Sequence, residues 1–461
     1  MNFDLSIQNK LPQLLDKHIA STHFAEILFQ RHRDHGIVIQ KDSQRQIKYD
    51  AFGCTLKAYG NGCWETATLV KPNLNVSSLE KTLKKLDGRL KEKKRTGFNS
   101  NYDLDSVVKP VQKKITTQTK DFVFSEIRKV LMESTKEVLV ANDFYIEYRE
   151  RTDEYLLINN KRARIEVKMP QVIVACELQF RIDQRIKTVE DMIGYRGDAQ
   201  LPEKLDLEPF IHRLVSYRKI KKKRIDIPTP LPIIFEPSAA GVFIHEVIGH
   251  ALEGDYIIGG SSYFRESLNN RICSYPITII DDPSTAGALG FYPFDHEAIE
   301  SQRKAIVEKG ILKGYLLDLE TASLLNMSPT GNARSSGPGQ VLLPRCSVLM
   351  VRGGEIHKDE TYDIFPVSLL VEGVSSAIVA PFSSSFILKA SAIHLVRNGK
   401  IVQSSGDVLM SGDAEEFLRN TYGLAKQTCI KSLVCAKSGN DLESSVICPS
   451  IFFDKVRVNL M

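Results

Sequence analysis

The sequence lacks long apolar runs. No stretch of its 461 residues approaches the roughly eighteen uninterrupted apolar side chains of a membrane-spanning helix. The first residues, MNFDLSIQNKLPQLLDKH, contain no apolar segment of the kind that directs secretion. We therefore expect a cytoplasmic protein that does not associate with membranes.

A strong excess of charge of one sign is also lacking. The 61 basic and 56 acidic residues nearly balance, and the net charge of +5 does not by itself indicate a nucleic-acid partner. The eight cysteines are scattered along the chain. In a reducing compartment, cysteines arranged in this way are more often free thiols or a metal ligand than disulfides.

The residues that are present indicate a globular protein, with 43% hydrophobic and 25% charged residues. A chain of this length exceeds one ordinary hydrophobic core, so two domains are expected. We predict the α+β class. A mixed α/β domain with helices on a twisted sheet is expected over 1–224, and a β-rich domain that carries a metal-binding helix is expected over 225–461.

Alternating apolar residues predict strands in the N-terminal domain, with a hairpin loop at 60–62, where Gly-Asn-Gly separates two such runs. A helix is expected from Ser77, with Glu80 completing a capping box and apolar residues at spacings of three and four. Two more helices are expected, at 119–135 and 205–219. The expected strands are 25–32, 36–40, 55–59, 63–70, 143–150, 154–160, 163–169 and 172–180.

The segment RKIKKKRIDIPTPLPIIFEP, residues 218–237, marks the domain boundary because its prolines cannot continue a helix. Its basic cluster, Lys219 to Arg224, raises the alternative of a nucleic-acid-binding protein. We favour a solvated helix end, where cations complement the helix dipole, because Tyr217 is the one aromatic residue nearby. Beyond this segment, short apolar runs separated by glycine, serine and proline predict the β-rich domain.

The segment GVFIHEVIGHALEGD, residues 241–255, places two histidines and a glutamate in an apolar helix that is expected to begin after Ser238 and to stop at Gly254. Metal-binding histidines on a helix usually lie four residues apart, which puts both on one face. His245 and His250 lie five apart, and a regular helix would turn them about 140° from each other.

A single π-type turn would bring the two histidines within roughly 50° of each other, and Gly249 would tolerate the distortion best. Three ionisable groups in an apolar helix need partners once water is removed, and a metal ion bound by His245 and His250 supplies them. Glu246 directly follows the first ligand. In the shorter zinc-peptidase motif, the glutamate at this position accepts the proton of the attacking water, so Glu246 is the expected catalytic base.

Several residues compete for the place of a third ligand, because distance along the chain does not give distance in space. Cys435 is favoured, because it opens CAKSGN, which we interpret as a loop at a strand end where Lys437 would favour the thiolate. Two imidazoles and a thiolate select zinc over magnesium or calcium. Glu253 and Asp255 are expected either to hydrogen-bond to the ligand imidazoles or to cap the next segment. The alternative ligands are the other cysteines, above all Cys429 and Cys448, and Glu253, Asp281, Asp282 and His296.

A long glycine-rich loop, SPTGNARSSGPG at 328–339, is a further candidate for function, because long ordered loops in compact domains usually serve one. Its Thr330, Gly331 and Asn332 offer hydrogen-bond donors without bulk, and we expect them to hold a substrate backbone. A β-rich cleft commonly binds a peptide as an added strand, so the expected substrates are unfolded peptides. An alternative is a non-catalytic scaffold whose structural metal is closed by a fourth protein ligand.

The motif and its neighbours resemble the TldD/PmbA metalloprotease family. HEVIGHALEGD is similar to the signature of the active subunit, and IIDDP, VEKGILKGYLLD, SPTGNAR, LVRNGKIV and CAKSGN agree with the family in order and spacing. The N-terminal segments are similar as well, so the resemblance covers most of the chain. It implies a zinc-dependent peptidase for unstructured peptides, with ligands His245, His250 and Cys435 and the catalytic glutamate Glu246.

The resemblance also implies an assembly, either a homodimer or a heterodimer with an inactive PmbA-like subunit. This chain keeps the metal motif and therefore resembles the active subunit. Two segments depart from the family. Paired arginines often follow the TGN residues, where this chain has Ala333-Arg334-Ser335, and a Pro-Arg-Met-Thr-Asn run is replaced by PRCSVLM. These departures bear on substrate preference and partner choice.

Overall fold

The structure is a computed structural model that describes residues 5–461 except 19–22, 71–73, 94–103, 117–140, 183, 198–206, 228 and 381. The helix predicted at 119–135 lies outside the described residues. The fold belongs to the α+β class, as predicted, with two large sheets and few helices. Within the described ranges, no helix has the length and apolar character needed to cross a membrane.

Seven strands form the N-terminal sheet, in the order β3-β2-β1-β5-β6-β4, with β7 also paired to β6. Neighbouring strands are antiparallel except β4 and β6. The strands are β1 (Phe24–Gln40), β2 (Ser43–Gly60), β3 (Cys63–Val70), β4 (Gln112–Thr116), β5 (Asp143–Asn159), β6 (Arg164–Ile182) and β7 (Arg185–Arg196).

Strands β1, β5 and β6 each replace two short strands that the sequence pattern predicted. The polar middle of β1 does not interrupt pairing with β5, because charged side chains pair across the sheet. Arg151 on β5 binds Asp34 on β1 at 2.8 Å, and Arg33 on β1 binds Glu154 on β5. The pattern therefore predicted where strands lie but not where they end.

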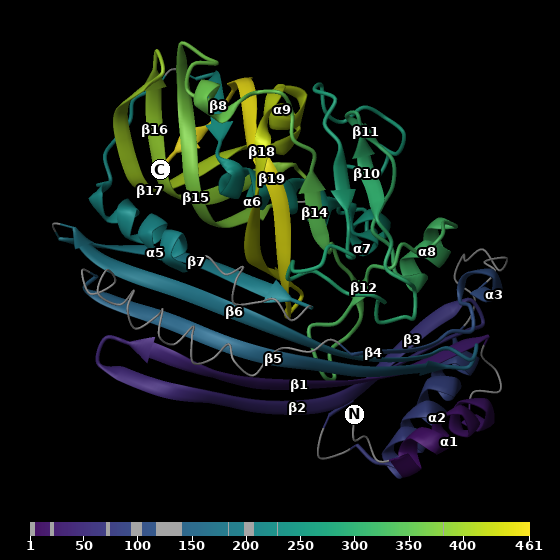
Figure 1. The fold of residues 1–461 in the computed structure, drawn as a ribbon. Helices are drawn as coiled ribbons and strands as arrows, with labels where there is room; N and C mark the ends of the chain where they lie inside the picture. Colours follow the sequence, from purple (N-terminus) through teal and green to yellow (C-terminus); the bar gives the residue numbers. More distant parts are fainter. Residues whose placement is uncertain are drawn as a thin grey trace.

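Helix α2 begins earlier than predicted, and the capping box expected at Ser77 and Glu80 is wrong. Asn75, which has the extended conformation of an N-cap, accepts the backbone N–H of Ser78 at 2.9 Å, and the Ser78 hydroxyl accepts the N–H of Asn75. Together with α1, α2 covers one face of the sheet (Figure 1). The helices of this half are α1 (Leu5–His18), α2 (Val76–Glu92), α3 (Leu104–Val107) and α5 (Leu207–Ser216).

The hairpin loop predicted between β2 and β3 is confirmed. Asn61 and Gly62 form the turn, with φ angles of 53° and 76°. Positive φ at both central positions matches the right-handed twist of the flanking strands. The helix predicted at 205–219 is α5, followed by a 3₁₀ turn at Tyr217–Lys219.

The C-terminal sheet has eleven strands in the order β11-β10-β9-β14-β19-β8-β15-β16-β17-β20, with β18 paired to β19. Its long strands are β15 to β19, and its other strands have five residues or fewer. The strands are β8 (Leu231–Phe235), β9 (Ile279–Asp281), β10 (Lys304–Glu308), β11 (Ile311–Leu312), β14 (Val348–Val351), β15 (Val367–Val379), β16 (Ser385–Arg397), β17 (Lys400–Asp413), β18 (Thr421–Lys437), β19 (Asn440–Val456) and β20 (Asn459–Leu460).

The rest of this half consists of short elements packed on or beside the sheet. Asp281 and Asp282 lie at the end of β9, as predicted for a strand end. The other elements are the paired strands β12 (Ala333–Arg334) and β13 (Leu343–Pro344) and the helices α6 (Pro237–Ile244), α7 (Gly254–Ile258), α8 (Leu319–Leu325) and α9 (Ala414–Arg419).

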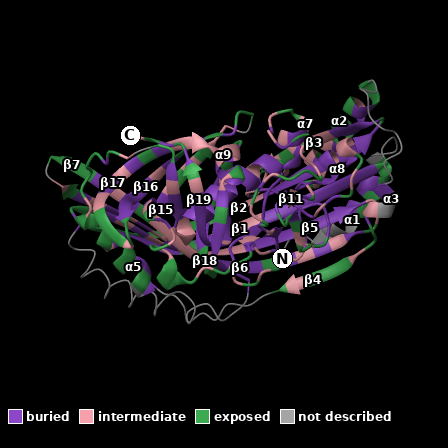
Figure 2. Ribbon diagram, turned by 90° about the horizontal axis from the view of Figure 1, so that it is seen from above, coloured by how far each residue is buried: buried purple, intermediate pink, exposed green. Residues whose placement is uncertain are grey.

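The C-terminal half lies on the face of the N-terminal sheet opposite α1 and α2 (Figure 1). Buried residues run through the interior of both sheets, while exposed residues gather on loops and outer edges (Figure 2). Ion pairs connect the two halves. Lys57 of β2, for example, pairs with Glu297 of the C-terminal half at 2.6 Å. Whether 1–224 and 225–461 are separate domains stays a prediction.

Candidate metal centre

The two histidines of the motif follow α6, which begins at Pro237 rather than after Ser238. The Glu236 carboxylate accepts the backbone N–H groups of Ser238 and Ala239, each at 3.0 Å, and therefore caps the helix two residues earlier than predicted. Proline suits the first helical position because it has no N–H to leave unsatisfied. The helix packs against β15, β18 and β19 and buries every residue from Ala239 to Ile244.

One π-helical turn, His245–Gly249, follows α6 and confirms the predicted distortion. The backbone N–H of His250 donates to the carbonyl of His245, five residues earlier. Gly249 keeps helical angles (φ −53°, ψ −64°), so backbone freedom is not the reason for glycine here. A Cβ atom at this position would lie 2.9 Å from Leu349 Cδ1 and 3.3 Å from Cys346 Sγ, so close packing requires glycine.

The helical run ends at Glu253, where ψ is 132°, one residue before the predicted stop at Gly254. Helix α7 starts again at Gly254. This break turns the Glu253 side chain back toward the histidines, where it is completely buried.

Three side chains from the two ends of the C-terminal half converge beside the π turn. The ligand atoms of His245, His250 and Cys435 all lie within 4.8 Å of one another. Cys435 Sγ lies 3.2 Å from His250 Nε2, and the two imidazole rings have centroids 5.0 Å apart. His245 Nε2 is buried and has no hydrogen-bond partner.

This donor set fits a zinc ion. In a tetrahedral site, ligand nitrogens lie about 3.3 Å apart and a nitrogen lies about 3.5 Å from a sulfur. The 3.2 Å between Cys435 Sγ and His250 Nε2 is close to this value, and the unpartnered nitrogen of His245 gains a partner if it coordinates a metal. Among the described residues, no fourth histidine, cysteine or carboxylate joins the cluster. Three protein ligands and one open position are typical of a catalytic rather than a structural zinc.

The outer nitrogen of each imidazole has its own partner. His250 Nδ1 lies 3.0 Å from Glu253 Oε2, and His245 Nδ1 lies 3.6 Å from Cys346 Sγ. Partners of this kind fix the tautomer and orientation of ligand histidines, so each Nε2 is left to face the metal position. Sequence reasoning missed Cys346, although its place in PRCSVLM, where the family pattern has methionine, was visible.

Glu253 joins several groups behind the cluster. It accepts hydrogen bonds from the Lys437 ammonium at 2.7 Å and from the Cys346 backbone N–H at 3.1 Å. Burial alone would raise the pKa of Glu253, but His250 and Lys437 outweigh this effect and lower the pKa to about 2. Glu253 is therefore ionised and contacts a ligand imidazole. Asp255 reaches the cluster only through Lys437, at 2.7 Å.

Cys435 lies within β18, two residues before its end, so the predicted loop position is wrong. Lys437 does not hold the thiolate, because its ammonium binds Glu253 and Asp255. The Arg345 guanidinium, which is 1% exposed, donates to Cys435 Sγ at 2.8 Å instead. Burial would raise the pKa of the Cys435 thiol, but the hydrogen bond from Cys346 and the nearby imidazoles hold the pKa well below its usual value.

Glu246 lies beside the cluster and outside the set of converging ligand atoms. Its side chain lines a groove of about 720 Å³ together with His250 and residues of β15 and β18. Burial raises the pKa of Glu246, while the two imidazoles lower it to a smaller extent. A carboxylate with a raised pKa at the wall of an open groove suits a group that accepts and returns a proton.

The family model of the PmbA/TldA metallopeptidase C-terminal domain matches residues 228–460. The chain belongs to the TldD/PmbA family.

The chain spans about half the length of each of three curated relatives that it matches. A metalloprotease of Methanocaldococcus jannaschii is 31% identical over 210 residues, which are 46% of each chain. A metalloprotease of Archaeoglobus fulgidus is 33% identical over 209 residues, 45% of this chain and 48% of the relative. A zinc metalloprotease TldD homologue of Saccharolobus solfataricus is 28% identical over 231 residues, 49% of this chain and 51% of the relative.

Solved structures share the TldD/PmbA fold over the whole chain. TldE of Thermococcus kodakarensis has a TM-score of 0.77 at 15% identity and covers 98% of this chain and 99% of its own. A Bacteroides thetaiotaomicron protein described as a proposed modulator of DNA gyrase has a TM-score of 0.76 at 18% identity and covers both chains completely. At such low identity, these likenesses describe the fold alone.

The TGN residues of this TldD/PmbA chain lie away from the groove, and none of them lines it. Asn332 is fully buried and donates to Asp281 Oδ2 and to the Arg345 carbonyl, each at 2.9 Å. The Thr330 hydroxyl binds Asn332 Oδ1 at 2.7 Å, and the Gly331 carbonyl accepts from a tyrosine hydroxyl. These bonds hold the backbone next to Arg345, whose guanidinium contacts Cys435. The predicted substrate-binding role of the three residues stays a prediction.

The other ligand candidates do not join the metal cluster. Asp281 binds Asn332 and Lys304, while Asp282 binds Arg303. The remaining candidates are Cys448, which is buried within β19, Cys429, which is exposed on β18, and His296, which accepts the backbone N–H of Ser335 at 3.0 Å.

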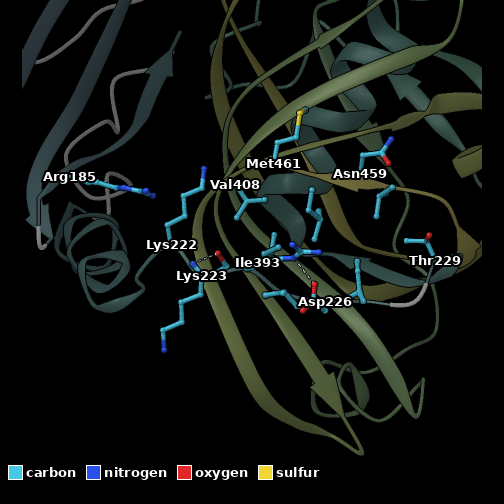
Figure 3. Close-up of a pocket in the computed structure, with 15 residues that line it drawn as sticks. Arg185, Lys222, Lys223, Asp226, Thr229, Ile393, Val408, Asn459 and Met461 are labelled. Carbon is cyan, nitrogen blue, oxygen red and sulfur yellow. Dashed lines mark hydrogen bonds and ion pairs between the residues drawn. The ribbon is translucent and has the colours of Figure 1, made fainter.

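The basic cluster Lys219 to Arg224 lies along β17, and its last three residues, Lys222, Lys223 and Arg224, line a separate surface pocket of about 610 Å³. Figure 3 shows Arg185 and Lys222 on one side of this pocket and Met461 and Asn459 on the other. The lysines are exposed, and Arg224 pairs with Asp226 at 2.7 Å. The pocket contains no residue of the metal centre, and no aromatic residue lines it.

Proposed function

We propose that this TldD/PmbA chain is the active subunit of a zinc-dependent peptidase that cleaves extended peptides. The observation that carries the proposal is the convergence of His245, His250 and Cys435 beside an open groove whose wall contains Glu246. Relatives of the chain are named metalloproteases, which supports peptidase chemistry.

The proposed metal ligands are His245 Nε2, His250 Nε2 and Cys435 Sγ. Zinc, when bound, supplies a Lewis acid that lowers the pKa of a water molecule toward 7 and polarises a carbonyl. The protein's own contribution is to orient the ligands. Glu253 and Cys346 contact the outer nitrogens of the imidazoles, and Arg345 donates a hydrogen bond to the Cys435 sulfur.

Glu246 is the proposed proton carrier. Its carboxylate takes a proton from the attacking water and returns it to the nitrogen of the leaving amine as the peptide bond breaks. Burial raises the pKa of Glu246, so its carboxylate is a stronger base than that of a solvated glutamate.

The groove supports binding of a peptide as an added strand. One wall consists of Ser375–Val379 of β15, which lie beyond the part of β15 that pairs with β8. The opposite wall includes residues 431–434 and Ala436 of β18, a stretch that pairs with β19 along one side. Backbone groups at such edges are free to pair with an extended chain, whereas a folded protein cannot supply one.

The floor of the groove comes from the N-terminal sheet. Cys176, Glu177 and Met192 of β6 and β7 line it, and Lys431 of β18 pairs with Asp191 of β7. The N-terminal half therefore closes one side of the groove. We propose that this arrangement excludes folded substrates.

We also propose that the chain works as a dimer, with itself or with a PmbA-like subunit. Ile378 and Phe382, near the turn between β15 and β16, are 74% and 75% exposed, and Ile378 lines the groove. Exposed apolar side chains beside a functional site suit contact with another protein. Light scattering at working concentration tests this part, and a fully active monomer would contradict it.

The test of the main proposal is elemental analysis of the purified protein combined with digestion of an unfolded peptide mixture. We expect close to one zinc per chain, cleavage that a chelator stops and zinc restores, and no cleavage of a stable folded protein. Peptides with N-methylated backbone amides should resist cleavage, because they cannot donate to a strand edge. Stoichiometric zinc without cleavage, alone and with a PmbA-like subunit, would favour the scaffold alternative.

A further inference from the structure

A second cluster of buried charged groups lies where the C-terminal half covers the N-terminal sheet. Arg196 of β7 and Asp153 of β5 extend from the sheet and are 6% exposed. Arg334, which follows the TGN residues, approaches from the C-terminal half and is 3% exposed. The proposed peptidase mechanism uses none of these side chains.

Arg334 has no hydrogen-bond acceptor for two of its buried nitrogen atoms, Nε and Nη1. Its guanidinium lies over the ring of Tyr292, 4.6 Å from the ring centre, and none of the described carboxylates lies within 4 Å of it. Removing a guanidinium from water without acceptors costs several kcal/mol, so such a group ordinarily has an anionic partner. The ring face alone does not provide directed acceptors for the N–H groups.

Arg196 and Gln171 add further unpartnered donors. Arg196 Nη1 donates to Gln171 Oε1 and to Asp153 Oδ2, each at 2.6 Å, but Arg196 Nε has no acceptor. Gln171 is 1% exposed, and its Nε2 has no acceptor either. The amide of Gln171 cannot be reversed, because its oxygen already accepts from a guanidinium that can only donate. Four buried donor nitrogens in this region therefore lack acceptors.

The charges of Arg196, Arg334 and Asp153 do not balance, and burial raises the pKa of the nearby Asp295 to about 7, so that this carboxyl group adds only a partial negative charge. Arg196 and Arg334 contribute two positive charges, and Asp153, whose pKa neighbouring cations hold well below its usual value against the effect of burial, contributes one negative charge. His32 and His296 add no charge, because burial lowers the pKa of both imidazoles. The neighbouring Arg151 is already paired with Asp34 and Glu443.

The unpartnered acceptors nearby do not restore the balance. Asp153 Oδ1 has no hydrogen bond but lies 3.4 Å from His32 Nε2. The negative charge of Asp153 is already included in the balance against the two arginines. The amide oxygen of Gln30, also unpartnered on β1, carries no charge. A water molecule would offer lone pairs but would add two more donors and no charge. A monovalent anion supplies acceptors alone and cancels the remaining positive charge.

We infer that Arg334, Arg196 and Gln171 form a binding site for one small monovalent inorganic anion, of the size and charge of chloride. The anion accepts hydrogen bonds from the guanidinium of Arg334, from Nε of Arg196 and from Nε2 of Gln171. It thereby fastens the residues after the TGN segment to the N-terminal sheet. The site is distinct from the metal centre and from the peptide groove.

Anion binding stabilises a segment that supports the metal centre. The backbone N–H of Ala333, next to Arg334, donates to Asp295 at 3.1 Å. Asn332 holds the carbonyl of Arg345, and Arg345 binds Cys435. Chloride is therefore expected to raise the melting temperature of the zinc-bound protein.

The test compares thermal unfolding in sodium chloride with thermal unfolding in sodium gluconate of the same ionic strength. We expect chloride to raise the melting temperature of the wild type saturably, on the order of 2 °C. Arg334→Met should lose this increase, and Arg334→Lys should need at least about five times more chloride. Arg419→Met, which removes an exposed arginine on α9, should behave as the wild type does. An equal chloride effect in the wild type and Arg334→Met would overturn the proposal.

A second measurement needs no variant and stays decisive if Arg334→Met fails to fold. In crystals of the wild-type protein grown in sodium bromide, we expect an anomalous peak within about 3.5 Å of the Arg334 and Arg196 nitrogens. Absence of such a peak at this position, with bromide visible elsewhere on the surface, would also overturn the proposal.

Discussion

Cys346 Sγ lies 3.6 Å from Nδ1 of His245. The backbone N–H of the same cysteine donates to Glu253, whose other carboxylate oxygen lies 3.0 Å from Nδ1 of His250. One residue therefore connects the outer sides of both histidines. The pair Cys346 and His245 replaces the carboxylate or carbonyl contact that usually orients a ligand imidazole.

Cys346→Ala should weaken zinc binding by about 10-fold or more, because loss of the partner leaves His245 free to change tautomer or rotate. Competition with a chromophoric chelator measures the change in affinity. Cys346→Ser, which keeps a hydrogen-bonding atom, should retain more of the affinity than alanine does. Equal affinities in the wild type and both variants would show that Cys346 only fills space.

Cys435→Ala should lose bound zinc and peptide cleavage while the protein stays folded, because one of three ligands is removed. Elemental analysis, a cleavage assay and circular dichroism measure the three properties. Cys429→Ala, at an exposed position, and Cys448→Ala, at a buried position outside the cluster, are matched controls that should keep both zinc and activity. Stoichiometric zinc and full activity in Cys435→Ala would remove this cysteine from the site.

Glu246→Gln should reduce cleavage by about 10²- to 10⁴-fold and leave zinc near one per chain. An amide cannot accept the proton of water, and Glu246 is not among the converging ligand atoms. Steady-state kinetics and elemental analysis on the same preparation separate the two effects. Loss of zinc together with activity would mean that Glu246 is a ligand or a structural group, and retained activity would exclude it as the base.

Glu26→Gln should stabilise the protein increasingly as the pH rises from about 5 to 8. Glu26 is 1% exposed, and neither carboxylate oxygen has a partner. Burial, and then the neighbouring Glu297, raises the pKa of Glu26 well above its value in the unfolded chain, about 4.3. Above that value the folded state holds a proton that the unfolded chain releases, so the wild type loses stability as the pH rises.

Urea unfolding of both proteins at several pH values measures this difference. Glutamine has no proton to lose at this position, so the difference in free energy of unfolding between variant and wild type should grow with pH. Glu92→Gln, at the exposed end of α2, is the control for removal of a carboxylate from a solvated position. A difference for Glu26→Gln that shrinks with pH would contradict the prediction.

The fold could be predicted in part. The hairpin at Asn61 and Gly62 and the class of the fold followed from local patterns, because turn conformation and strand alternation depend on neighbouring residues. The continuous length of β1 did not follow from them. Its polar middle is stabilised by Arg151 and Glu154, which are more than a hundred residues away along the chain.

The candidate site could also be predicted in part. The five-residue spacing of His245 and His250 required a π turn if both were to reach one metal, and the turn is present. The surroundings of Cys435 were predicted incorrectly, since the cysteine lies in a strand and contacts Arg345 instead of Lys437. A contact between residues that are 90 positions apart leaves no pattern in a single sequence.

By itself, the sequence determined the features that depend on a few consecutive residues: the histidine spacing, the glutamate beside the first histidine and the tight hairpin. Only the tertiary structure decided which cysteine meets the histidines, because strand β18 returns beside α6 after almost two hundred residues. It also placed Cys346 beside His245 and brought Arg334 and Arg196 into one buried region. Burial in a shared interior makes such pairs interact strongly, and burial depends on the packing of the whole chain.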